Sequence, residues 1–244
     1  MLSQMKTKLL VIGGWLLAAA SLGTPAGAQT PEYTGNRVCT KCHFSQGDAW
    51  RATGHAKAFD SLKPKVKAAA KTLAGLDPVK DYSADQNCVA CHVTGHDETG
   101  GYKTGMNPDD AKLVVGVSCE SCHGAGSIYR QKHADAVDKL KASGEATDRQ
   151  VLVDTKQNFD YESTCARCHL NYKGSPWAGA KPPYSPFTPA VDPKYLFDFD
   201  KAVRVAGDKN PAHTHYKLRG VFKGGTVPAI RADIQQDALE EPAE

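Results

Sequence analysis

Four copies of one short pattern, C-x-x-C-H, contain every cysteine of this chain of 244 residues. In this pattern two thiols bond covalently to a haem group, and the histidine that follows coordinates the haem iron from the proximal side. Because the chain has 8 cysteines and none lies outside the pattern, the sequence predicts four covalently bound haem c groups. The predicted attachment residues are Cys39, Cys42, Cys88, Cys91, Cys119, Cys122, Cys165 and Cys168, and the predicted proximal ligands are His43, His92, His123 and His169.

Three other uses of paired cysteines fit this pattern less well. A disulfide framework in an exported protein does not require a histidine after every second cysteine. A zinc ribbon built from C-x-x-C pairs does not require that histidine either, and a thioredoxin-like redox pair needs one motif rather than four. The repeated histidine therefore favours haem attachment over all three.

The first 28 residues are typical of a secretory signal peptide. Lys6 and Lys8 form a basic start, an apolar stretch follows from 9 to 20, and Ala26-Gly27-Ala28 is a small-residue cleavage site. The apolar stretch is too short for a stable membrane span. We therefore expect export to the periplasm with cleavage near Ala28, and no stable membrane span after cleavage.

The rest of the chain divides into a haem-binding domain, 29–228, and an acidic tail, 229–244, which we expect to be frayed. Leu, Ile, Val and Phe make up only about 17% of the residues after Ala28, a level at which a highly charged chain is disordered. The formal net charge of the whole chain is only +3, which is too mild to indicate a nucleic-acid partner. We therefore expect a mainly α multihaem cytochrome c with short β segments, in which the four haems form the core.

Helix signals lie between the motifs. They predict helices over 45–62, 64–73, 128–143 and 198–206, and a Val-rich stretch predicts a short strand over 112–117. The stretch 175–193 contains six prolines, so it cannot form a regular helix and is expected to be a stiff loop or a linker.

The distal side of each iron needs a second ligand, and histidine is the main candidate. Met106 is the one methionine after the signal peptide, so at most one haem can have His/Met ligation. The histidines outside the motifs are His55, His96, His133, His213 and His215. Bis-histidine ligation should therefore dominate.

Helix geometry excludes two pairings. A helical His55 lies twelve residues beyond His43, roughly 18 Å along the helix axis, whereas the two ligand nitrogens of one iron lie only about 4 Å apart. The same argument separates His133 from His123. Distal ligands must therefore come from other segments, and each bis-histidine haem connects two distant parts of the chain.

The remaining histidines are weaker candidates. His96 follows His92 by one helical turn on the same side, so it cannot reach the opposite face of that iron. His213 and His215 are two residues apart and point in different directions, so we expect only one of them to be a ligand.

Several stretches of the sequence resemble the tetrahaem cytochrome c-554 family of ammonia-oxidising bacteria. Besides the four motifs, they are Gly54-His55-Ala-Lys-Ala, Gly116-Val-Ser-Cys-Glu-Ser-Cys-His-Gly, Cys168-His169-Leu-Asn-Tyr-Lys-Gly-Ser-Pro-Trp-Ala-Gly-Ala-Lys, Pro183-Tyr-Ser-Pro-Phe-Thr-Pro and His213-Thr-His-Tyr-Lys-Leu-Arg-Gly-Val-Phe. The resemblance covers nearly the whole chain after the signal peptide. It implies a mostly α-helical periplasmic tetrahaem protein that accepts electrons from hydroxylamine oxidoreductase and passes them toward the quinone pool through a membrane-bound cytochrome.

The same resemblance implies the ligand sets. Three haems would be bis-histidine, with the pairs His43 and His133, His123 and His55, and His169 and His213. The haem of the second motif, with proximal His92, would be five-coordinate, and its distal face would be covered by Ser185, Pro186 and Phe187. The chain differs from the family at Ser185, where the family has threonine, and at His96, where the family has an aromatic residue.

Two functions fit these features. We expect an electron carrier, in which haems close together take electrons from one redox protein and release them to another. The alternative is an enzyme that reduces a small nitrogen oxide, such as nitric oxide, at the open haem of the second motif. No motif reads C-x-x-C-K, so the lysine-ligated haem of multihaem nitrite reductases is not indicated.

Overall fold

The computed structural model describes residues 29–169, 192–204, 214–225 and 229–242. The chain divides into two compact units, Met1–Thr30 and Pro31–Glu244, and the second unit contains all four motifs. The predicted signal peptide, the predicted distal cover Ser185, Pro186 and Phe187, and the predicted ligand His213 lie outside the described residues. Within the described ranges, we find no helix with the length and hydropathy needed to cross a membrane.

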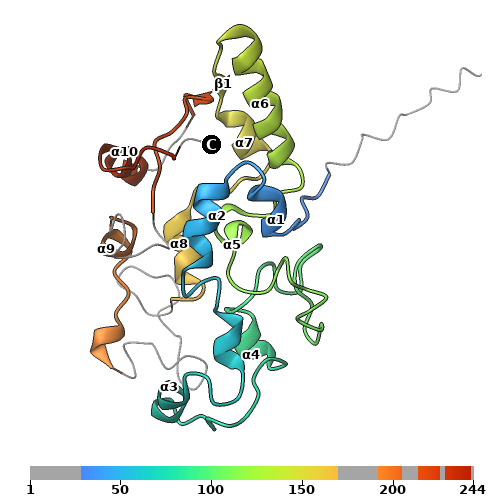
Figure 1. Ribbon diagram of the computed structural model, residues 1–244, viewed down its shortest axis with the longest axis vertical. Coiled ribbons are helices and arrows are strands. Elements are labelled where there is room, and N and C mark those ends of the chain that lie inside the picture. The colour runs from blue at the N-terminus through green and yellow to red at the C-terminus, as the bar shows by residue number, and fades with distance from the viewer. Residues whose placement is uncertain (1–28, 170–191, 205–213, 226–228, 243–244) are drawn as a thin grey trace, which may run out of the picture. The chain divides into compact units, whose positions relative to one another are not determined.

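The described part of the second unit is mainly helical, as expected (Figure 1). Its helices are α1 (Asn36–Cys39), α2 (Phe44–Arg51), α3 (Ala68–Leu73), α4 (Gln86–Val89), α5 (Cys119–His123), α6 (Tyr129–Ser143), α7 (Gln150–Asp154), α8 (Tyr161–Ala166), α9 (Phe199–Arg204) and α10 (Ala229–Gln236), and the 3-10 turns are η1 (Phe59–Leu62) and η2 (Pro193–Tyr195). The helix predicted over 128–143 is confirmed as α6. It ends at Gly144, whose φ of 71° is a left-handed conformation that glycine adopts without steric cost.

Two predicted helices are shorter than expected. The helix predicted over 45–62 stops at Arg51, and turns connect it to η1. The helix predicted over 64–73 begins only at Ala68, because Lys65 and Lys67 have φ angles of 64° and 50°, outside the right-handed helical region.

The strand predicted over 112–117 is wrong. The amides of Val114 and Val115 both donate to the carbonyl of Ala111, so the backbone turns on itself there. A single isolated bridge pairs Val115 with Val93. The apolar run therefore packs through local turns rather than through a sheet ladder.

Each haem motif begins in a very short helix, in α1, α4, α5 and α8 respectively, and α5 spans its whole motif. Two of them are capped by an aspartate directly before the helix. Asp85 accepts a hydrogen bond from the Asn87 amide, and Asp160 accepts one from the Ser163 amide. These caps start the turn that brings the two cysteines of a motif to one side of the chain.

The β structure consists of small pairings, as expected for short β segments. β1 (Thr147–Asp148) and β2 (Phe222–Lys223) form a parallel pair, with Thr147 opposite Phe222. This pairing connects the end of α6 to a segment about 75 residues further along the chain.

The segment after residue 229 differs from the frayed tail that we expected. It forms α10, and the amide of Leu239 then donates to the carbonyl of His215 while the amide of Lys217 donates to Leu239. Arg219 also pairs with Glu241 at 2.7 Å. These long-range bonds hold in place residues after 229 that the acidic composition alone would predict to be a frayed tail.

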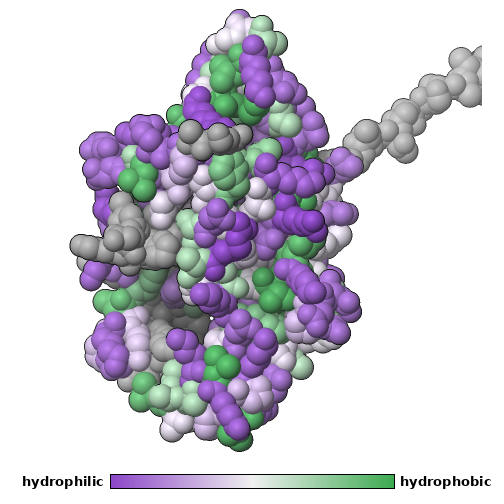
Figure 2. Space-filling view, in the orientation of Figure 1, coloured by the Kyte–Doolittle hydropathy of each residue, from purple (hydrophilic) through white to green (hydrophobic). Residues whose placement is uncertain are grey.

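Buried aliphatic and aromatic side chains gather around the second motif. The cluster consists of Phe59, Leu62, Tyr82, Val89, Val93, Tyr102, Ala111 and Val114. On the face shown in Figure 2, hydrophilic residues predominate and apolar residues form small separate patches. The second motif therefore lies on a side-chain core, a feature that the low aliphatic content did not lead us to expect.

Candidate functional site

All eight motif cysteines are free thiols in this structure, and none forms a disulfide. The Cys39 thiol is in hydrogen-bond contact with Cys119, and the Cys91 thiol is in contact with Cys168. The first motif is therefore next to the third, and the second motif is next to the fourth. The cysteines therefore form no disulfide framework.

The third and fourth motifs are joined by Asn158. Its side-chain amide donates to the carbonyl of Cys122 at 2.7 Å and to the Thr164 hydroxyl at 2.7 Å. Its backbone amide donates to the carbonyl of His123 at 2.8 Å. These bonds hold α5 against α8, which the structure packs together. The motifs therefore form a series in space: first, third, fourth, second.

The imidazoles of His43 and His133 face one another. Their ring centroids lie 6.4 Å apart, and two imidazoles on one metal are expected at about 6 Å because each metal–nitrogen bond is about 2 Å long. Nε2 of His133 lies 3.0 Å from Oε1 of Gln157, which leaves Nδ1 as the nitrogen that can reach a metal. This geometry fits the predicted pairing.

His55 faces His169, with ring centroids 6.0 Å apart. The structure thus differs from the pairing of His55 with His123 that the resemblance implied. The reason lies in the turn after α2, where the carbonyl of His55 accepts the amide of Val117 at 3.0 Å. At Gly116 a Cβ would come within 2.7 Å of the Ala56 carbonyl oxygen, so only glycine permits this close approach.

His92 is oriented by the backbone of a distant residue, Ala58, which lies directly before η1. Nδ1 of His92 lies 2.6 Å from the carbonyl oxygen of Ala58, so the Nδ1 proton donates there. Nε2 is then the nitrogen that carries a lone pair for a metal. Sequence reasoning missed Ala58, because a backbone acceptor leaves no signal in residue type.

The surroundings of His123 also suit a metal ligand. Its Nδ1 atom is buried and has no hydrogen-bond partner among the described residues, an arrangement that costs free energy unless another group satisfies the ring. Loss of hydration, helped by the nearby charges of Arg231, His43 and His133, lowers the pKa of His123 to about 4. The ring is therefore neutral, which is the form that binds metals.

Loss of hydration lowers the pKa of the other candidate ligands as well. The shift is downward for His43, His55, His92 and His133. Paired neutral imidazoles about 6 Å apart, together with free thiols separated by two residues, form a donor set that fits covalently attached haem. The residues present therefore suit the group that the sequence predicts.

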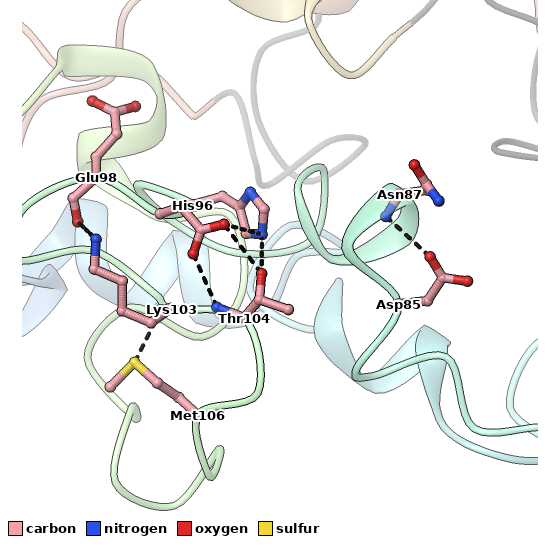
Figure 3. Close-up of polar contacts among 8 residues, drawn as sticks. Asp85, Asn87, His96, Glu98, Lys103, Thr104 and Met106 are labelled. Atoms are coloured by element: carbon pink, nitrogen blue, oxygen red, sulfur yellow. Dashed lines mark hydrogen bonds and ion pairs between the residues drawn. The ribbon is translucent and has the colours of Figure 1, made fainter.

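His96 and Met106 make local polar contacts instead (Figure 3). Nε2 of His96 lies 2.8 Å from Oγ1 of Thr104 and 3.5 Å from a carboxylate oxygen of Asp97. The sulfur of Met106 accepts the amide of Lys103 at 3.0 Å. Both side chains thus hold the loop that follows the second motif.

His215 contacts the backbone, with Nε2 lying 2.9 Å from the carbonyl oxygen of Val203. Because His213 lies outside the described residues, the expectation that only one of His213 and His215 is a ligand stays a prediction.

Three comparisons with known proteins point to the same family. Residues 38–124 and 126–183 match the family model described as "Cytochrome c554 and c-prime". The chain is 46% identical over 239 residues to cytochrome c-554 of Nitrosomonas europaea, covering 97% of this chain and 98% of that protein. It is also similar to the solved structure of the reduced state of cytochrome c554 from Nitrosomonas europaea, with 45% identity and a TM-score of 0.76, over 87% of this chain and 99% of that one.

Proposed function

Because this chain belongs to the cytochrome c-554 family and is a c-type cytochrome that carries electrons on covalently bound haems, we propose that it works in the periplasm between two redox proteins. The donor in this proposal is a hydroxylamine oxidoreductase-like enzyme. The acceptor is a membrane-bound cytochrome that passes electrons toward the quinone pool.

The observation that carries the proposal is the spatial series of the four motifs. Cys39 contacts Cys119, Asn158 joins the third motif to the fourth, and Cys91 contacts Cys168. Haem supplies a reversible one-electron change at its iron. The residues of the chain attach the groups, supply imidazole ligands and bring the four attachment sites next to one another. A carrier needs this arrangement, with an entry at one end of the series and an exit at the other.

The ligand assignment within the proposal follows the ring geometry. We assign His133 to the iron of His43 and His55 to the iron of His169, since each pair of rings lies about 6 Å apart. His213 then serves the iron of His123. His92 keeps its single imidazole and the distal cover of Ser185, Pro186 and Phe187.

Electron paramagnetic resonance of the ferric protein tests this assignment. We expect three low-spin signals and one high-spin signal. His55→Ala should convert the haem of the fourth motif to high spin, and His133→Ala should convert that of the first. Four low-spin signals in the unaltered protein would contradict the five-coordinate second site.

Stopped-flow reduction tests the carrier role. The oxidised protein is mixed with hydroxylamine oxidoreductase and hydroxylamine, and all four haems are expected to become ferrous within the turnover time of the enzyme. Cell fractionation then checks the periplasmic location. Reduction no faster than with hydroxylamine alone would overturn the proposed donor.

The alternative function, reduction of a small nitrogen oxide, depends on the second motif. Among the described residues, no second imidazole faces His92 in the way that His133 faces His43. Steady turnover of nitric oxide with a reductant, lost when the second haem is blocked, would favour this alternative over a carrier.

A further inference from the structure

The third motif contains a carboxylate in its interior. Glu120 lies between Cys119 and Cys122, and its side chain is 0% exposed. Burying an ionised carboxylate costs much free energy unless hydrogen-bond donors surround it. What surrounds Glu120 therefore decides whether it carries a charge.

The donors around Glu120 are numerous and neutral. The Gly35 amide donates to Oε2 at 2.7 Å and the Gly126 amide to Oε1 at 2.7 Å. The Thr34 amide lies 3.0 Å from both oxygens, and the Thr34 hydroxyl donates to Oε1 at 3.1 Å. Both carboxylate oxygens accept, and the three backbone amides among these donors cannot accept a hydrogen bond from a protonated carboxyl. The contacts therefore fit the anion.

No cation neutralises this anion within the described part of the chain. None of the ion pairs found there includes Glu120. Backbone amides stabilise the carboxylate, but they leave its net charge in place. The field of that charge is weakly screened in the interior.

The position of Glu120 directs this field toward two haem sites. It follows Cys119 directly, and the Cys119 thiol contacts Cys39 of the first motif. Through Gly35, which precedes α1, the carboxylate also holds the helix that ends at Cys39. The first and third motifs thus share one buried negative charge.

We propose that Glu120 sets the reduction potentials of the haems attached at the third and first motifs, by stabilising the ferric over the ferrous state. A ferric iron has one more positive charge than a ferrous iron, so a nearby anion favours oxidation. Glu120 acts as a positioning and potential-setting residue and is not a haem ligand. The inference requires haem at these motifs and does not depend on which proteins donate or accept electrons.

The test is a potentiometric titration of the holoprotein, resolved by optical and paramagnetic resonance spectra. For Glu120→Gln we expect at least one of the four one-electron components to become easier to reduce. The ferrous-to-ferric ratio at a fixed potential should rise about tenfold, which is a shift of about 59 mV for one electron. The largest shift should fall on the haem of His123.

A matched control is Glu162→Gln, which removes an exposed carboxylate three residues before Cys165 of the fourth motif. Solvent screens an exposed charge, so this variant should leave all four potentials nearly unchanged. Full haem content in the Glu120→Gln protein with unaltered potentials would overturn the proposal. So would an equal shift in both variants.

A second variant tests the proposal if the Glu120→Gln protein fails to assemble. Thr34→Val keeps the carboxylate but removes the hydroxyl donor to Oε1, so the negative charge is less well compensated. We expect the same component to become harder to reduce, a shift opposite in sign to that of Glu120→Gln. No shift, or a shift in the other direction, would contradict the role of the charge.

Discussion

The second and third motifs have the same cysteine spacing, but the side chain buried between the two cysteines is apolar in one motif and charged in the other. The residue after the first cysteine is Val89 in the second motif and Glu120 in the third, and both side chains are 0% exposed. Val89 packs within the aliphatic and aromatic cluster, whereas Glu120 accepts hydrogen bonds from a neutral backbone cage. One short pattern is thus held in place by two different kinds of interaction.

The difference extends to the surroundings of each motif. Around the second motif, side chains such as Leu62 and Tyr82 form a core of polypeptide. Around the other three motifs, the contacts include hydrogen bonds of Asn158 and facing imidazole pairs such as His43 and His133. We therefore expect haem to be most necessary for folding where side-chain packing is weakest.

The largest expected effect comes from removing haem. Replacing Cys119 and Cys122 by serine should prevent attachment at the third motif and abolish the protection of amides in α1, α5 and α8 from hydrogen exchange. Replacing Cys88 and Cys91 should leave amides of the side-chain cluster protected. Native protection of α5 in the first variant would contradict the expected dependence of this helix on haem.

A cavity in the cluster should have the next largest effect. Leu62 is 5% exposed, so Leu62→Ala should lower the free energy of unfolding by about 2–5 kcal/mol. Thermal unfolding of the holoprotein measures the change. Leu73→Ala serves as the control, because Leu73 is 55% exposed and its truncation should cost no more than about 0.5 kcal/mol.

Breaking the polar connection of the third and fourth motifs should cost less. Asn158→Ala leaves the Cys122 carbonyl without its donor and should destabilise the holoprotein by about 1–3 kcal/mol. Denaturant unfolding followed at the Soret band measures this change. Asn87→Ala, at an exposed position, should change the free energy of unfolding very little. Equal effects of the two variants would show that Asn158 does not hold α5 against α8.

The smallest effect concerns pH at the loop that follows the second motif. The amide and hydroxyl of Thr104 donate to Asp97 at 3.1 and 3.2 Å, and the amide bond is the main reason that the pKa of Asp97 lies below its ordinary value. Because the pKa is lower in the folded state, the stabilisation is present above the ordinary carboxyl pKa and is lost as pH falls through the lowered one.

Thermal unfolding of an Asp97→Asn variant at several pH values checks this prediction. The variant should be slightly less stable than the unaltered protein at neutral pH, and the difference should vanish in acid. Asp110→Asn is the control and should show no such convergence. A difference that persists in acid would mean that the charge of Asp97 is not involved.

Much of the fold was predictable, and the failures have identifiable causes. The helix carrying His133 was predicted because its pattern is long and ends at Gly144. The helix expected over 45–62 failed because residues after Arg51 bond to the distant segment around Val117. The expected strand over 112–117 failed because its amides bond locally to Ala111.

The sequence by itself determined the attachment chemistry. Two thiols and an imidazole within five residues are a local property, so Cys119, Cys122 and His123 could be assigned before any fold was known. Which imidazole faces which was decided only by the tertiary structure. His55 meets His169 because a turn at Gly116 allows two distant segments to touch, and such long-range closure depends on packing that no local pattern encodes.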